Sequence, residues 1–103
     1  MANVDTLKVK VQNAQDKVEK VKKTIARHEA QLEKKRNELI KKGYDLSDMQ
    51  ALKDKLRGTD DSWKAYDIES KERDIISANK KLVDAERILA DWQEKLSIET
   101  EKE

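Results

Sequence analysis

A seven-residue repeat of apolar side chains constrains this chain more than any other feature of its sequence. Between residues 4 and 39, one line of positions at alternating steps of three and four residues is apolar at nine of eleven places. A disordered chain would not keep this register over five heptads. The repeat predicts a helix over about 4–42 with an apolar seam. The seam positions are Val4, Leu7, Val11, Ala14, Val18, Val21, Ile25, His28, Leu32, Lys35 and Leu39.

A second seam occupies the C-terminal part of the chain. Its large apolar residues are seven apart, with Ala or Trp between the later ones, Lys71 between the first two and Lys64 before them. This pattern predicts a helix over about 61–98, followed by an acidic tail, residues 99–103, that frays. The apolar members of the second seam are Ile68, Ile75, Ala78, Leu82, Ala85, Leu89, Trp92 and Leu96.

The segment between the two seams predicts a short third helix. Gly43 suits the end of the first helix, and Gly58 bounds the middle segment. Ser47 and Gln50 match a capping box, so a helix over about 48–57 is expected. Thr59, Asp60 and Asp61 then serve as caps and acidic residues at the start of the last helix. The apolar residues expected to cover this end of the molecule are Leu39, Ile40, Leu46, Met49, Leu52, Leu56, Trp63 and Tyr66.

The two long helices are expected to pair with each other in antiparallel fashion. Residues whose numbers add to 103 then face each other, which places Lys42 opposite Asp61. Residues 1–43 carry 12 basic and 6 acidic side chains, and residues 44–103 carry 11 basic and 16 acidic ones, so the two helices attract. The predicted fold is an all-α, antiparallel coiled-coil helical hairpin that forms a single domain, residues 1–103.

The composition argues against several classes of function. The chain has no Cys and one His, so we expect no catalytic residues, metal site or cofactor-binding site, and no enzyme activity. His28 is expected beside a water or a carboxylate at the edge of the seam. No apolar run approaches the ~20 residues of a membrane span, and residues 1–20 are charged throughout, so a cytoplasmic protein without a signal peptide is expected.

Apolar residues outside the seams indicate a partner. A two-helix hairpin buries little surface, so we expect a homodimer, in the form of a four-helix arrangement, or docking on another protein. Two blander interpretations remain open: scattered surface apolar residues, and a small aromatic core at the turn. The candidate partner-binding residues are Tyr44, Met49, Trp63, Tyr66, Ile76 and Val83.

The first helix also carries a basic surface. Nucleic acid binds to such stripes, but acidic residues interleave with this one, the net charge is only +1, and no aromatic residues accompany it. Nucleic-acid binding is therefore possible but disfavoured. The candidate basic residues are Lys17, Lys20, Lys23, Arg27, Lys34 and Arg36.

No motif names a family, so the function is expected from architecture alone. The first hypothesis is a non-enzymatic coiled-coil module that self-associates and binds a protein through its charged flanks and its aromatic turn end. The alternative rests on a general resemblance to small phage or mobile-element accessory proteins, which implies inhibition of a host nucleic-acid enzyme or defence system by occlusion. The second alternative is a nucleic-acid-binding accessory protein that uses the basic first helix.

Overall fold

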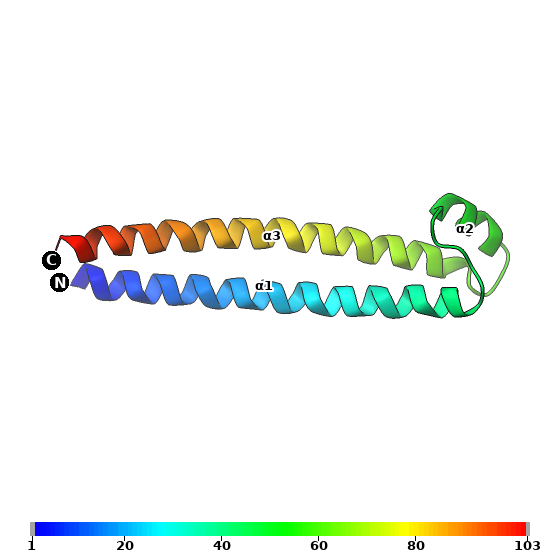
Figure 1. Cartoon of the computed structure of the whole chain (residues 1–103), viewed down its shortest axis with the longest axis horizontal. Helices are drawn as coiled ribbons and strands as arrows, with labels where there is room; N and C mark the ends of the chain where they lie inside the picture. Colours follow the sequence, from blue (N-terminus) through cyan, green and yellow to red (C-terminus); the bar gives the residue numbers. More distant parts are fainter. Residues whose placement is uncertain (1, 103) are drawn as a thin grey trace. The chain divides into compact units, whose positions relative to one another are not determined.

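The computed structural model describes residues 2–102 and confirms the all-α hairpin. Within this range there are three helices: α1 (Ala2–Lys41), α2 (Met49–Leu56) and α3 (Ser62–Glu101). The two long helices run in opposite directions, and the short helix lies in the connection between them (Figure 1).

The C-terminal helix is longer than predicted. It continues to Glu101, three residues past the expected end, so residues 99–101 are helical rather than frayed. Gly58 is the last glycine and the chain has no proline, so nothing in the tail breaks a helix. The Thr100 hydroxyl also donates to the Leu96 carbonyl at 2.8 Å within the last turns.

Contacts divide the chain into two compact units. The terminal unit combines the chain up to Ile25 with the chain from Ala78 onward, and the turn unit is Ala26–Ser77. Each unit contains a stretch of α1 and a stretch of α3, and the turn unit also contains α2. A single domain over 1–103 stays a prediction.

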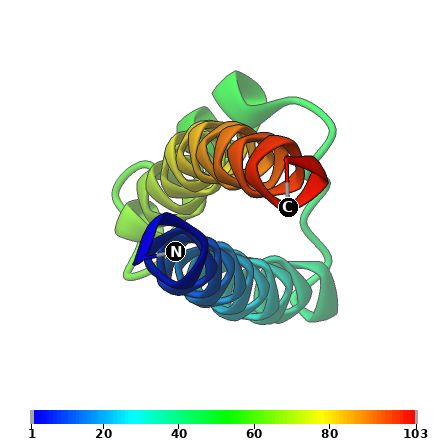
Figure 2. The same ribbon diagram turned by 90° about the vertical axis from the view of Figure 1, so that its left-hand side faces the viewer.

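In the terminal unit, the two predicted seams form the contact between the helices. Figure 2 views this unit along its helices, which lie side by side. Every described seam position of this unit is buried or half-buried, whereas the other positions from 4 to 23 and from 79 to 98 are exposed. The buried residues are Ala14, Val18, Ile25, Ala78 and Ala85.

The turn unit has a different core, which contains larger side chains. Leu39, Leu52, Leu56, Ala65 and Ile68 form a buried cluster contributed by all three helices. The half-buried residues packed against this cluster are Leu32, Tyr44, Leu46 and Met49. Ile40, Trp63 and Tyr66 were expected in this core but are exposed.

The end of α1 has the geometry that Gly43 predicts. Gly43 has a φ of 90°, a conformation that costs a residue with a Cβ about 1–2 kcal/mol. Its N–H donates to the Ile40 carbonyl at 2.9 Å, and the Tyr44 N–H donates to the Leu39 carbonyl at 3.2 Å. These two bonds define a Schellman motif, and the contact of Tyr44 with the core completes it.

The start of α2 differs from the predicted capping box. Asp48, not Ser47, is the N-cap, and its carboxylate accepts from the N–H groups of Gln50 and Ala51 at 3.1 and 3.2 Å. The Ser47 N–H instead donates to the Asp45 carboxylate at 2.9 Å. Asp and Ser are nearly equivalent as caps, so the capping-box pattern alone did not discriminate between these adjacent positions.

The predicted register of the long helices agrees with contacts in both units. In the turn unit, Lys42 pairs with Asp61 at 2.7 Å, and their numbers add to 103 as predicted. In the terminal unit, the Lys10 ammonium lies 5.9 Å from the centroid of the Trp92 ring, one residue from the predicted partner of Trp92. A periodic seam with one compact connection leaves little freedom in register.

Candidate partner-binding surfaces

Trp63 and Tyr66 form the most exposed aromatic surface of the turn unit. They lie three residues apart at the start of α3, and their exposed fractions are 57% and 60%. The Lys64 ammonium lies 5.9 Å from the Trp63 ring centroid, and the Lys53 ammonium lies 4.9 Å from that of Tyr66. Between these two rings in sequence, Ala65 is fully buried, so the helix that carries them is firmly packed.

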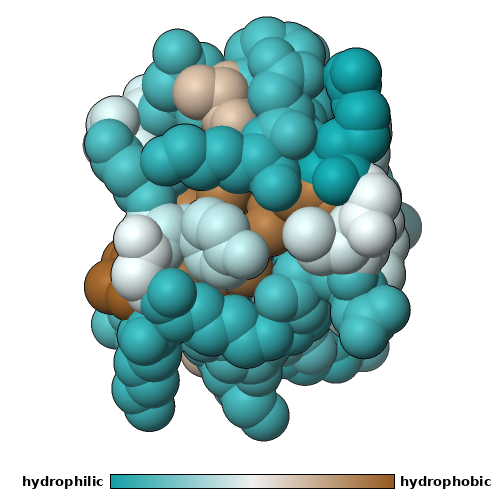
Figure 3. Space-filling view, turned by 90° about the vertical axis from the view of Figure 1, so that its right-hand side faces the viewer, coloured by the Kyte–Doolittle hydropathy of each residue, from teal (hydrophilic) through white to brown (hydrophobic). Residues whose placement is uncertain are grey.

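The surface at the turn end is mostly hydrophilic. Figure 3 shows hydrophilic side chains over most of this face, with apolar surface visible between them. Lys53 also pairs with Glu69, and Lys64 pairs with Asp61 at 3.0 Å. The lysines beside the rings are therefore held by Glu69 of α3 and by Asp61, which directly precedes α3.

The other four candidate residues have different environments. Tyr44 and Met49 are half-buried against the core of the turn unit, so only part of each side chain can meet a partner. Ile76 belongs to the turn unit and Val83 to the terminal unit, and both are exposed. Of the six residues, only Trp63 and Tyr66 form an adjacent exposed pair within one unit.

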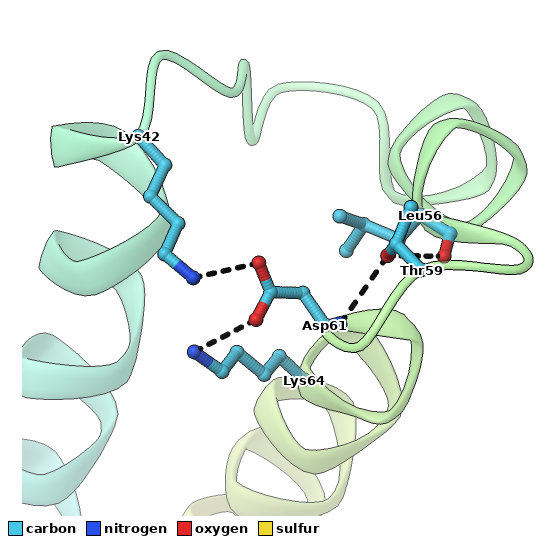
Figure 4. A network of polar contacts seen from close by, with 5 residues as sticks. All are labelled: Lys42, Leu56, Thr59, Asp61 and Lys64. Carbon is cyan, nitrogen blue, oxygen red and sulfur yellow. Dashed lines mark hydrogen bonds and ion pairs between the residues drawn. The ribbon is translucent and has the colours of Figure 1, made fainter.

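A polar network links α1 to the start of α3 (Figure 4). Each oxygen of the Asp61 carboxylate pairs with one ammonium group, Lys42 at 2.7 Å and Lys64 at 3.0 Å. The hydrogen bond from Lys42, followed by that from Lys64, lowers the pKa of Asp61 below its usual value, and the same bond raises the pKa of Lys42. Asp61 was expected to act at the helix start, but its carboxylate pairs with lysines, while its N–H donates to the Thr59 hydroxyl at 3.3 Å.

A second aspartate is stabilised in its charged form in the connection between α1 and α2. The hydrogen bond donated by the Ser47 backbone N–H is the main cause that lowers the pKa of Asp45. Asp45 thus holds the start of the turn region through a local bond, and Asp61 holds its end through ion pairs with Lys42 and Lys64.

The basic candidates are all exposed, but they are not equivalent. Arg36 pairs with Glu72 at 2.6 Å. Lys17, Lys20 and Lys23 in the terminal unit, and Arg27 and Lys34 in the turn unit, have no ion pair within residues 2–102. These five cations remain available to an anionic ligand.

The polar residues of the seam are half-buried and have partners. The Lys71 ammonium donates to His28 Nδ1 at 3.2 Å, so the neighbour of the imidazole is an amine rather than the expected water or carboxylate. Lys35 pairs with Asp67. The lysine stems thus cross the seam while their charged ends reach polar groups.

Sequence reasoning missed one exposed apolar residue and misplaced another. Val9 lies off the seam and is 57% exposed, and Ile40 was assigned to the core but is 54% exposed. Ile88 and Ile98, which also lie off the seam, are exposed as expected for surplus apolar residues. The heptad phase could have identified Val9, whereas Ile40 required the position of α2.

Two further observations concern the described chain. Over residues 2–102 there is no group of three or more His, Cys, Asp or Glu side chains that could hold a metal ion. None of the helices in this range is both long enough and apolar enough to span a membrane.

Comparison with known proteins gives no relative: no family model, curated protein or solved structure matches the chain.

Proposed function

We propose that this chain is a non-enzymatic coiled-coil interaction module that binds a protein partner through its turn end. The observation that carries the proposal is the exposed pair Trp63 and Tyr66, held on a helix whose neighbouring Ala65 and Ile68 are fully buried. Tryptophan and tyrosine are enriched among the residues that dominate protein interfaces. Anchors on a packed helix also lose little conformational freedom when they bind.

The charges around Trp63 and Tyr66 support a protein partner that has both apolar and polar groups. The lysines beside the two rings are already paired with Glu69 and Asp61, so the rings are framed by neutralised ion pairs rather than by a free cationic patch. Such a surface favours an apolar centre with a polar rim, as protein interfaces have. Occlusion of a host enzyme, as in a mobile-element inhibitor, would be one form of this binding.

Affinity capture from the native cell tests the proposal. The tagged full chain is compared with a Trp63→Ala/Tyr66→Ala variant and with Val9→Ala, a control whose residue has the same 57% exposure as Trp63 but lies in the other unit. We expect the double variant to lose its partner at least about tenfold and the control to retain it. Equal capture by all three chains, with circular dichroism unchanged, would contradict the proposal.

A second candidate function is nucleic-acid binding, favoured by the unpaired cations on α1. Lys20, Lys23 and Arg27 are exposed and have no ion pair within the described chain. Reversal of these three charges should abolish retention on nucleic acid and its salt dependence. If the charge-reversed variant is still retained on nucleic acid, nucleic-acid binding through these residues is excluded.

A further inference from the structure

We propose that two copies of this chain associate through one side of the terminal unit, where α3 carries a third line of apolar residues. This line consists of Val83 and Ala90, beside the seam residues Leu82, Leu89 and Leu96; we call these five residues the α3 stripe. The inference goes beyond the partner binding proposed above, because it concerns self-association and uses a surface distinct from Trp63 and Tyr66.

The first observation is that the terminal unit does not close its own core. Its buried side chains are three alanines, Val18 and Ile25, the five residues given above. Its larger seam residues remain half-buried, because two helices meet along one line and leave both flanks of a leucine open. The half-buried seam residues are Val4, Leu7, Val11, Val21, Leu82, Leu89, Trp92 and Leu96.

The second observation is the width of the apolar surface on α3. A two-stranded coiled coil needs two apolar positions in each heptad, whereas a helix in a bundle has three. Val83 and Ala90 each follow a seam leucine by one residue, so they widen the apolar surface of α3 beyond the two seam positions, and both are exposed, Val83 at 66%. Ser97 continues the same line and borders a hollow with Val11 and Leu96, so the seam is open on this side.

The third observation is the amount of exposed surface. The accessible surface is 7530 Å², whereas a compact monomer of 12.0 kDa is expected to expose roughly 6,000 Å². The excess of about 1,500 Å², which is summed over both units, exceeds the ~800 Å² that each partner buries in an interface of standard size. A second copy packed on the α3 stripe would cover surface that the single chain leaves exposed.

Charge complementarity indicates a second copy as the occupant. In the terminal unit, the α1 side, residues 1–25, has six basic and three acidic side chains, and the α3 side, residues 78–103, has five basic and seven acidic ones. A two-fold dimer that sets α1 of each copy against α3 of the other pairs opposite charges twice. Two acidic residues, Asp84 and Glu86, lie between Val83 and Ala90 in the sequence. Glu86, the one nearer the seam, would then face a basic helix.

Sedimentation of the purified full chain at low and high micromolar concentrations tests the dimer. We expect the wild-type mass to rise toward twice 12.0 kDa. Val83→Lys places a charge in the proposed contact and should raise the dissociation constant at least about tenfold. Val9→Lys is the matched control, because Val9 is also an exposed valine of the terminal unit but lies on α1 away from the seam, and it should leave the dissociation constant unchanged.

Two further measurements keep the proposal falsifiable. Ala90→Lys should weaken the dimer as Val83→Lys does, and circular dichroism should show both variants folded as helices. A wild-type chain that stays monomeric, or a dimer that Val83→Lys and Val9→Lys weaken equally, overturns the proposal. A monomer whose Val83→Lys variant loses a captured protein assigns the stripe to another partner and overturns it as well.

The proposed partner binding at the turn end and the proposed dimer can each be contradicted without the other. Trp63→Ala/Tyr66→Ala should leave the dimer intact, and Val83→Lys should leave capture at the turn end intact. Loss of the dimer in the aromatic variant would place self-association at the turn end and contradict the α3 stripe.

Discussion

Leu39 and Ile40 are consecutive residues of α1 with opposite environments. Leu39 is completely buried in the core of the turn unit, whereas Ile40 is 54% exposed. Leu39→Ala leaves a cavity and should lower the free energy of unfolding by about 2–5 kcal/mol, while Ile40→Ala should change it by less than about 0.5 kcal/mol. Urea denaturation followed by circular dichroism measures both. Similar losses in the two variants would mean that α2 does not cover the Leu39 side of the helix.

Asp61 is expected to make stability depend on pH in the acid range. Its lysine partners lower its pKa below the usual 3.8, so its contribution is complete above that value and is lost as the pH falls through the lower, folded-state value. Asp61→Asn should therefore melt at a lower temperature than the wild type near neutral pH, and the difference should shrink well below pH 3.8. Melting curves over the acid range provide the measurement. A difference that stays constant at the lowest pH would rule out this role.

Lys42, the partner of Asp61, makes stability depend on pH in the alkaline range, with the opposite sign. The pKa of Lys42 is raised above 10.5, so its contribution is present below that value and is lost as the pH rises through the raised one. The same Asp61→Asn variant should consequently approach the wild type again in strongly alkaline solution.

At the scale of elements, α2 depends on its cap because it has only eight residues. Asp48 accepts from two of the N–H groups that a helix start leaves without partners, whereas the Ser47 contact uses only backbone N–H. Asp48→Ala should cost about 0.5–2 kcal/mol of unfolding free energy, and Ser47→Ala should cost much less. Chemical denaturation of both variants decides between the two caps. A larger loss for Ser47→Ala would restore the capping box that the sequence predicts.

The same element explains which core residues were misassigned. Helical periodicity identifies the apolar side of a long helix, but it cannot say where a short third helix packs. In the turn unit, α2 places Leu52 and Leu56 against Ala65 and Ile68 rather than against Trp63. Small Ala65 had no sequence signal as a core residue, because its burial depends on the approach of another helix.

At the scale of the whole molecule, the two units should differ in local stability. The turn unit buries Leu39, Leu52, Leu56 and Ile68 almost completely, whereas three of the five buried apolar residues of the terminal unit are alanines. Burial of apolar area is the main stabilising contribution, so backbone amides of the terminal unit should exchange faster in a dilute solution of the chain. Hydrogen exchange read by mass spectrometry measures this. Slower exchange in the terminal unit at the same dilution would contradict the expected order.

The sequence by itself determined the two seams, their antiparallel pairing and the glycine that ends α1. These features repeat every heptad or depend on one backbone conformation, so neighbouring residues carry enough information to predict them. Only the tertiary structure decided that Trp63 and Tyr66 are exposed and that Lys71 contacts His28. Each of these depends on where a non-repeating connection places one helix against another, and that position is a property of packing rather than of local pattern.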